Sequence, residues 1–115
     1  MILPATFDDL IKRAYQKDLY KNLIKQLNKD FLYANIDMEF DLEVLPTSLK
    51  LILHETIYNL IQEKFTDYLN LLYIIDVSEK KVKELDSQDM VRLSEQVTFL
   101  ILQREWQKVW YKSQF

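Results

Sequence analysis

Residues 36–44, IDMEFDLEV, alternate strictly between apolar and acidic side chains. A period of two is the pattern of a half-buried β-strand. The rest of the chain offers no clear partner strand, and an unpaired strand leaves backbone N–H and C=O groups without hydrogen bonds. Three interpretations stay open: an extended strap packed on helices, a ladder with the same segment of a second copy, and a strand that receives a peptide from a partner. We favour the strap, because a ladder would place like charges opposite one another.

Nearly all of the remaining chain follows the helical period instead. The apolar face turns by about 140° near Lys17–Asp18, which predicts a break between two helices, and Asn35 is expected to close the second one. Later periodic stretches predict helices over about 48–75, 79–85 and 88–112. The helix over 48–75 has the broadest apolar arc and is expected to be central. The pattern thus predicts an all-α fold, in which a single domain, residues 1–115, forms a compact bundle of four to five helices with one extended segment near residues 36–44.

The last predicted helix carries two apolar faces that point in roughly opposite directions. A small bundle seldom offers two such contacts to one helix, so we expect the second face to meet either the folded-back N-terminal helix or another subunit. The enrichment of aromatic residues at interfaces mildly favours another subunit. The candidate interface residues are Phe99, Leu102, Trp106, Val109 and Trp110, together with Ile36, Met38, Phe40 and Leu42 of the extended segment.

Composition excludes several classes of site. The chain has 115 residues, 49% of them hydrophobic, and contains neither cysteine nor glycine. Without cysteine there are no disulfides, thiolate metal sites or cysteine nucleophiles. Without glycine, neither a P-loop nor a dinucleotide-binding loop can form. The start MILPATFDDL does not have the pattern of a signal peptide, and no apolar run approaches the ~20 residues of a membrane span, so we expect a soluble, cytoplasmic protein.

The overall charge argues against nucleic acid as a partner. The net charge is −3, whereas nucleic-acid-binding proteins usually carry a basic surplus. Four lysines nevertheless form a stripe at i,i+4 spacing: Lys17, Lys21, Lys25 and Lys29. We interpret this lysine stripe as a solvated helix face, and we keep binding to nucleic acid or an anionic surface as an alternative function.

The only histidine, His54, raises the question of catalysis. HETIY at 54–58 begins like a zinc protease motif, but Tyr58 stands where the second histidine would be. No recognisable nucleophile motif accompanies His54, and the sequence predicts neither a cofactor nor a metal. We interpret His54 as a half-buried, hydrogen-bonded residue. A small ligand-binding or enzymatic site around His54, Glu55 and Tyr58 is kept as a second alternative.

Two segments, LLYIIDVSEKKV at 71–82 and LILQREWQKVW at 100–110, resemble stretches of a small all-helical bacterial protein family. The resemblance covers about the last 65 residues and includes no mechanistic motif. It implies a helical protein in a bacterial, cytoplasmic setting, and it implies no activity and no site residues.

Taken together, these patterns favour a non-enzymatic protein-interaction or assembly module. The expected partner is a second copy of the chain, in a homodimer, or another protein. The reasons are the two apolar faces of the last helix, the lone alternating segment and the lack of a recognisable catalytic motif.

Overall fold

The computed structural model describes all 115 residues, and all of its regular secondary structure is helical. The predicted all-α class is confirmed, but the predicted number of four to five helices is wrong, because the structure has six. They are α1 (Phe7–Gln16), α2 (Tyr20–Tyr33), α3 (Pro46–Glu63), α4 (Phe65–Ile75), α5 (Glu79–Lys83) and α6 (Met90–Ser113). None of them is both long and apolar enough to cross a membrane.

The extra helix comes from a break in the helix that was predicted over 48–75. Lys64 leaves the helical region, with φ −140° and ψ 61°, and separates α3 from α4. A straight helix of that length would span about 42 Å at 1.5 Å per residue. The longest extent of the whole molecule is 36 Å. Folding back at Lys64 keeps the molecule compact and lets Tyr68, Leu71 and Ile75 of α4 join the core.

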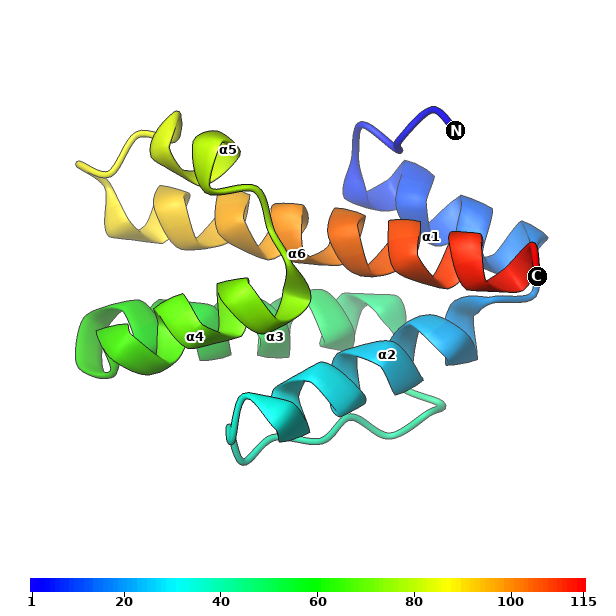
Figure 1. Cartoon of the computed structure of the whole chain (residues 1–115), viewed down its shortest axis with the longest axis horizontal. Coiled ribbons are helices and arrows are strands. Elements are labelled where there is room, and N and C mark those ends of the chain that lie inside the picture. The colour runs from blue at the N-terminus through cyan, green and yellow to red at the C-terminus, as the bar shows by residue number, and fades with distance from the viewer.

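The central helix is α6, rather than the helix predicted over 48–75. In Figure 1, α6 runs along the long axis of the molecule, with α2, α3 and α4 below it and α1 and α5 above it. It packs against α1, α2, α3 and α4. The buried apolar side chains of the molecule form one continuous core of 25 residues.

Both apolar faces of α6 are buried within the single chain. Val97 and Ile101 on one face, and Leu102 and Trp106 on the other, are all less than 2% exposed. The N-terminal segment folds back onto α6, where the Gln103 amide donates a hydrogen bond of 2.8 Å to the carbonyl oxygen of Pro4. The second contact therefore comes from the same chain, in part from the folded-back N-terminal helix that was one of the two predicted alternatives.

Three residues take the left-handed backbone conformation that glycine usually supplies. Asp18, Asn35 and Asp76 have φ angles of 57°, 60° and 71°. Asp and Asn accept this conformation more readily than most residues, because their short side chains can bond to the local backbone. The predicted break near Lys17–Asp18 and the predicted end of the second helix at Asn35 are both confirmed. A chain without glycine thus ends three of its helices at Asp or Asn.

Residues 36–44 form a strap that contains no β-strand and that ends in a turn at residues 42–43, closed by a hydrogen bond of 3.0 Å from the Val44 amide to the Asp41 carbonyl oxygen. In the first part of the strap, the apolar side chains are buried or partly buried and the acidic ones are exposed. Phe40, for example, is 5% exposed and lies between the exposed Glu39 and Asp41. The interpretation as a strap packed on helices is therefore confirmed for residues 36–40, whereas Leu42, in the turn that follows, is 36% exposed. Pairing of the strap with a second copy or with a partner peptide would have to compete with the contacts described next.

The polar side chains of α2 satisfy the backbone of the strap in place of a partner strand. Asn28 Oδ1 accepts a hydrogen bond from the Phe40 amide at 2.8 Å, and Asn28 Nδ2 donates to the Phe40 carbonyl oxygen at 2.9 Å. The Tyr20 hydroxyl donates to the carbonyl oxygen of Val44 at 2.6 Å. A single asparagine thus makes both bonds that a neighbouring strand would make to the most buried strap residue.

Candidate functional site

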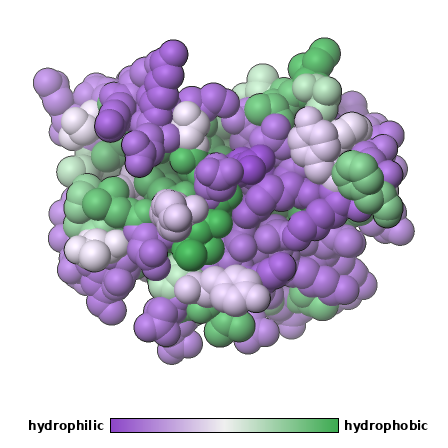
Figure 2. Space-filling model, viewed as in Figure 1, coloured by the Kyte–Doolittle hydropathy of each residue, from purple (hydrophilic) through white to green (hydrophobic).

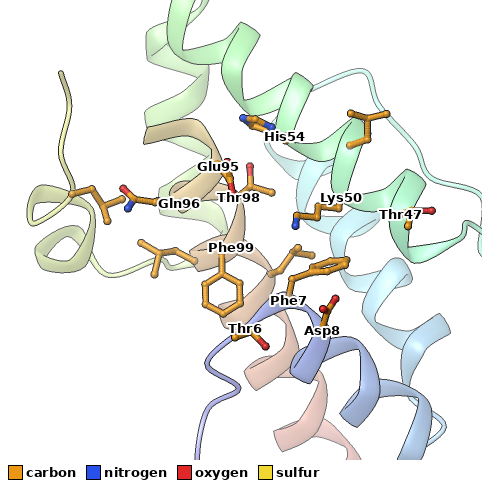
Figure 3. Close-up of a pocket in the computed structure, with 14 residues that line it drawn as sticks. Thr6, Phe7, Asp8, Thr47, Lys50, His54, Glu95, Gln96, Thr98 and Phe99 are labelled. Atoms are coloured by element: carbon orange, nitrogen blue, oxygen red, sulfur yellow. The ribbon is translucent and has the colours of Figure 1, made fainter. Parts of the chain in front are cut away.

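A cleft with a volume of about 700 Å³ lies between the start of α1, the first half of α3 and the middle of α6. This volume falls in the range of ~300–1,000 Å³ that is usual for small-molecule sites. Phe7 of α1, Leu51 of α3 and Phe99 of α6 are among its apolar lining residues. Figure 3 shows side chains from these three helices converging on the same space. Only the folded chain brings these helix segments together.

Lys50 is the positively charged group of this cleft. Its side chain points from α3 into the cavity (Figure 3), and its Nζ lies 5.2 Å from the centroid of the Phe7 ring. None of the five ion pairs of the molecule includes Lys50, nor do they include Asp8 or Glu95, the two carboxylates that also line the cleft. The ammonium group is therefore held against an aromatic ring without a carboxylate partner, an arrangement that attracts the cation only weakly, by about 0.5–1 kcal/mol.

His54 lies at one end of the cleft and is bonded to α6. Its Nε2 is 2.7 Å from Ser94 Oγ and 3.3 Å from the carbonyl oxygen of Val91. The Ser94 hydroxyl already donates to the Val91 carbonyl oxygen at 2.8 Å. In this arrangement Ser94 Oγ accepts from Nε2–H, which corresponds to the tautomer with its proton on Nε2. The interpretation of His54 as a half-buried, hydrogen-bonded residue is confirmed.

The pairing of His54 with Ser94 does not have the arrangement of a nucleophile and its base. A nucleophilic serine donates its proton to the histidine and faces the substrate. Ser94 donates to a backbone carbonyl instead, and it is 0% exposed. The pair therefore joins α3 to α6. Sequence reasoning missed this pair, because the two residues are 40 positions apart and no motif connects them.

The predicted polar site of three residues is not assembled in the structure. Of His54, Glu55 and Tyr58, only His54 lines the cleft. Consecutive residues of a helix point about 100° apart, so the side chain of Glu55 leaves α3 in another direction and is exposed. No group of three or more histidine, aspartate or glutamate side chains converges on a point that could hold a metal ion.

A buried polar cluster, which sequence reasoning also missed, joins α2 to α6. Lys108 Nζ lies 2.6 Å from Asp30 Oδ2 and 2.7 Å from Glu105 Oε1. Gln26 donates to both carboxylate oxygens of Asp30 at 3.2 Å. Asp30 is 4% exposed and Glu105 is 0% exposed. Helical spacing pairs Gln26 with Asp30 and Glu105 with Lys108, but Asp30 and Lys108 are 78 positions apart, so no pattern of the sequence joins the two pairs.

The two carboxyl groups of this cluster titrate differently. Burial, together with hydrogen bonding to Asp30, raises the pKa of Glu105 to about 9. Burial also acts to raise the pKa of Asp30, but hydrogen bonds from Glu105 and Lys108 outweigh it and hold the pKa below its usual value. No donor of the chain makes a hydrogen bond of good geometry to either carboxyl oxygen of Glu105, and Lys108 Nζ is only an ion-pair neighbour of Oε1, so the hydrogen bond to Asp30 requires a proton on Glu105. A protonated, neutral Glu105 that can donate to Asp30 agrees with this environment.

Most residues of the predicted interface are buried or partly buried within the single chain. At most 5% of the side chain is exposed at four of its residues: Phe40, Leu102, Trp106 and Val109. Four others are partly buried and pack against the same core: Ile36, Met38, Phe99 and Trp110. Leu42, which is 36% exposed, is the most exposed of the nine residues. The four buried residues were wrongly predicted to face a partner, because other elements of their own chain cover them.

A different apolar surface is exposed on α4. Phe65, Leu69 and Tyr73 are four residues apart, so they form one stripe along the helix, and they are 54%, 50% and 82% exposed. We call this stripe the α4 face. Figure 2 shows hydrophobic side chains gathered over α4. The only charged residue of α4, Asp67, projects about 160° away from Leu69.

The lysine stripe is partly occupied by contacts within the chain. Lys21 Nζ lies 2.8 Å from the Glu43 carboxylate of the strap, which raises the pKa of Lys21 through their hydrogen bond and charge. Lys29 Nζ lies 5.9 Å from the centroid of the Tyr33 ring. The acidic side of the strap thus faces part of the stripe, which reduces the positive charge available to a phosphate or an anionic surface.

Comparison with known proteins adds no likeness to this picture. No family model, no curated protein and no solved structure matches the chain. The resemblance of residues 71–82 and 100–110 to a helical bacterial family therefore stays a prediction.

Proposed function

We propose that this protein is a non-enzymatic interaction module that forms a homodimer through the α4 face. The observation that carries the proposal is the exposure of Phe65, Leu69 and Tyr73 on a side of α4 that holds no charge. Charged residues are 29% of the chain, and none of them lies on this stripe, which is about two helical turns long. The centres of protein interfaces are likewise depleted of charge and enriched in aromatic residues.

The size of the α4 face suits the centre of an interface. Its exposed fractions correspond to on the order of 350 Å², if a fully exposed aromatic side chain offers ~200 Å². A standard interface buries ~800 Å² on each partner, of which only the central part is apolar. The neighbouring polar residues of α4, among them Thr66 and Asn70, would then lie at the rim of the contact.

The spacing of the α4 face suits a second copy as the partner. Phe65 and Tyr73 lie four residues to either side of Leu69. If two α4 helices pack antiparallel across a two-fold axis at Leu69, each Phe65 meets Tyr73 of the second copy. Aromatic pairs of this kind contribute about 0.5–1.5 kcal/mol each beyond the area they bury. No like charges meet in the seam, which removes the objection that applies to a ladder of acidic straps.

Size-exclusion chromatography with light scattering tests the proposal. We expect the wild-type protein to have twice the monomer mass at micromolar concentration. Leu69→Glu places two carboxylates against each other at the two-fold axis, so we expect it to give the monomer mass. Because Leu69 is half exposed, the variant should keep its helical circular dichroism.

Leu45→Glu is the matched control, since Leu45 is 66% exposed and precedes α3 rather than lying on α4. This variant should remain dimeric. A wild-type protein that is monomeric up to millimolar concentration would refute the proposal, and so would a Leu69→Glu variant that keeps the dimer mass.

A further inference from the structure

We propose that the cleft between α1, α3 and α6 binds a small amphipathic molecule with one carboxylate and an apolar chain. The carboxylate would bind to Lys50, and the chain would lie between Phe7 and Phe99. This second site is independent of the α4 face, because no residue of α4 lines the cleft.

The walls of the cleft suit an apolar chain. Phe7 and Phe99 are partly buried, and Leu51 is 67% exposed, so a bound chain would remove further apolar surface from water. Two hydroxyl groups of the lining are already engaged. Thr6 Oγ1 accepts from a backbone amide of α1 at 3.1 Å, and Thr98 Oγ1 donates to a backbone carbonyl of α6 at 2.7 Å. Gln96 Oε1, by contrast, is buried without a hydrogen-bond partner, and Lys50 is the only cation of the lining, so these two groups are the ones left to recognise a polar head group.

Lys50 selects an anionic head group. Its ammonium group points into the cavity (Figure 3), and it has no ion-pair partner in the chain. Lys50 is an exposed residue, and its ammonium nitrogen lies over the Phe7 ring at this edge of the cleft. A ligand carboxylate would form a charge-assisted hydrogen bond there, which is stronger than a bond between neutral groups.

The carboxylates of the lining limit the ligand to a single negative charge. Asp8 lies in the first turn of α1, where the partial positive charge of the helix N-terminus offsets it. Glu95 is exposed to water on α6. Both would still repel the second negative charge of a phosphate monoester, and only one ammonium group is present to bind it. The lining therefore favours a monoanion over a dianion.

Three probes that share one alkyl chain and differ in their head group are octanoate, octanol and octylammonium. Comparing their affinities isolates the contribution of the head group to binding. Each is titrated into the full chain and followed by the NMR shifts of backbone amides and of the Phe7 and Phe99 rings. We expect octanoate to bind at least about tenfold more tightly than the other two, the ratio that one charge-assisted bond provides. The largest shifts should map to the cleft.

Lys50→Gln should remove the preference for octanoate and leave the affinity for octanol unchanged. Lys25→Gln makes the same substitution at an exposed lysine of α2 outside the cleft, and it should keep the preference. The proposal is overturned if octylammonium binds most tightly, if no probe binds, if the three bind equally, or if Lys50→Gln keeps the wild-type ratio. Shifts confined to the α4 face would also overturn it, while leaving the proposed dimer intact.

Discussion

Replacement of Glu105 by glutamine should abolish a specific dependence of stability on pH. Burial raises the pKa of Glu105 from 4.5 in the unfolded chain to about 9 in the folded one. Between these two pKa values the folded chain binds one proton more than the unfolded chain. The free energy of unfolding of the wild-type protein must then fall as the pH rises, by up to about 1.4 kcal/mol per pH unit.

The size of the effect follows from that slope. From about pH 5 to pH 8 the wild-type protein should lose at most about 4 kcal/mol through Glu105 alone. Asp30 does not oppose this loss in the same range, because its lowered pKa confines its own titration to more acidic pH. Glutamine has nearly the shape of a protonated glutamate and can also donate to Asp30. The variant should therefore match the wild-type protein near pH 5 and exceed its stability near pH 8.

Urea unfolding followed by circular dichroism at several pH values measures this difference. The comparison is made at one protein concentration, because self-association would itself change the apparent stability. Glu95→Gln is the matched control, since Glu95 is an exposed glutamate on the same helix, and its curve should run parallel to the wild type. If the stability of Glu105→Gln falls with pH as steeply as that of the wild-type protein, Glu105 is not the group responsible and the reasoning is wrong.

Three further predictions concern the fold. Asn28→Ala should lower the free energy of unfolding by about 1–3 kcal/mol, because it removes both hydrogen bonds to the Phe40 backbone; faster hydrogen exchange at the Phe40 amide would identify the cause. Trp106→Ala should lower the free energy of unfolding, measured in urea, by about 3–5 kcal/mol, because Trp106 is 1% exposed. Trp110→Ala should lower it distinctly less, because Trp110 is only partly buried. Asp18→Val should lower the free energy of unfolding by about 1–2 kcal/mol, because a β-branched residue opposes φ 57°, whereas Asp18→Gly should leave it almost unchanged. Equal thermal midpoints for these two variants would contradict the assigned conformation of Asp18.

Local patterns of the sequence were sufficient for the helical class and for several boundaries. The break near Asp18 and the end of α2 at Asn35 follow from a change of apolar face and from a residue that accepts positive φ. The strap could also be recognised, because its apolar and acidic residues alternate like those of a β-strand while the rest of the chain is helical and offers no partner strand. Each of these conclusions depends on residues within one or two helical turns of each other.

The break at Lys64 could not be recognised in this way. No proline, glycine or capping side chain marks it, and the apolar arc continues through it. An unbroken helix over 48–75 would be longer than the core that all the helices form together, and only the tertiary structure sets the size of that core. The same break turns Phe65 and Leu69 outward and creates the α4 face.

The candidate sites were decided by the tertiary structure alone. The apolar pattern showed correctly that α6 needs two contacts, but a sequence cannot say whether a neighbour comes from the same chain or another, since the side chains required are identical. Trp106 is therefore a core residue here. The cleft at Lys50 and the cluster of Asp30, Glu105 and Lys108 each join helices that are distant in sequence. Helix periodicity determines which side of each helix is apolar, whereas packing in three dimensions determines which side chains meet and which remain exposed.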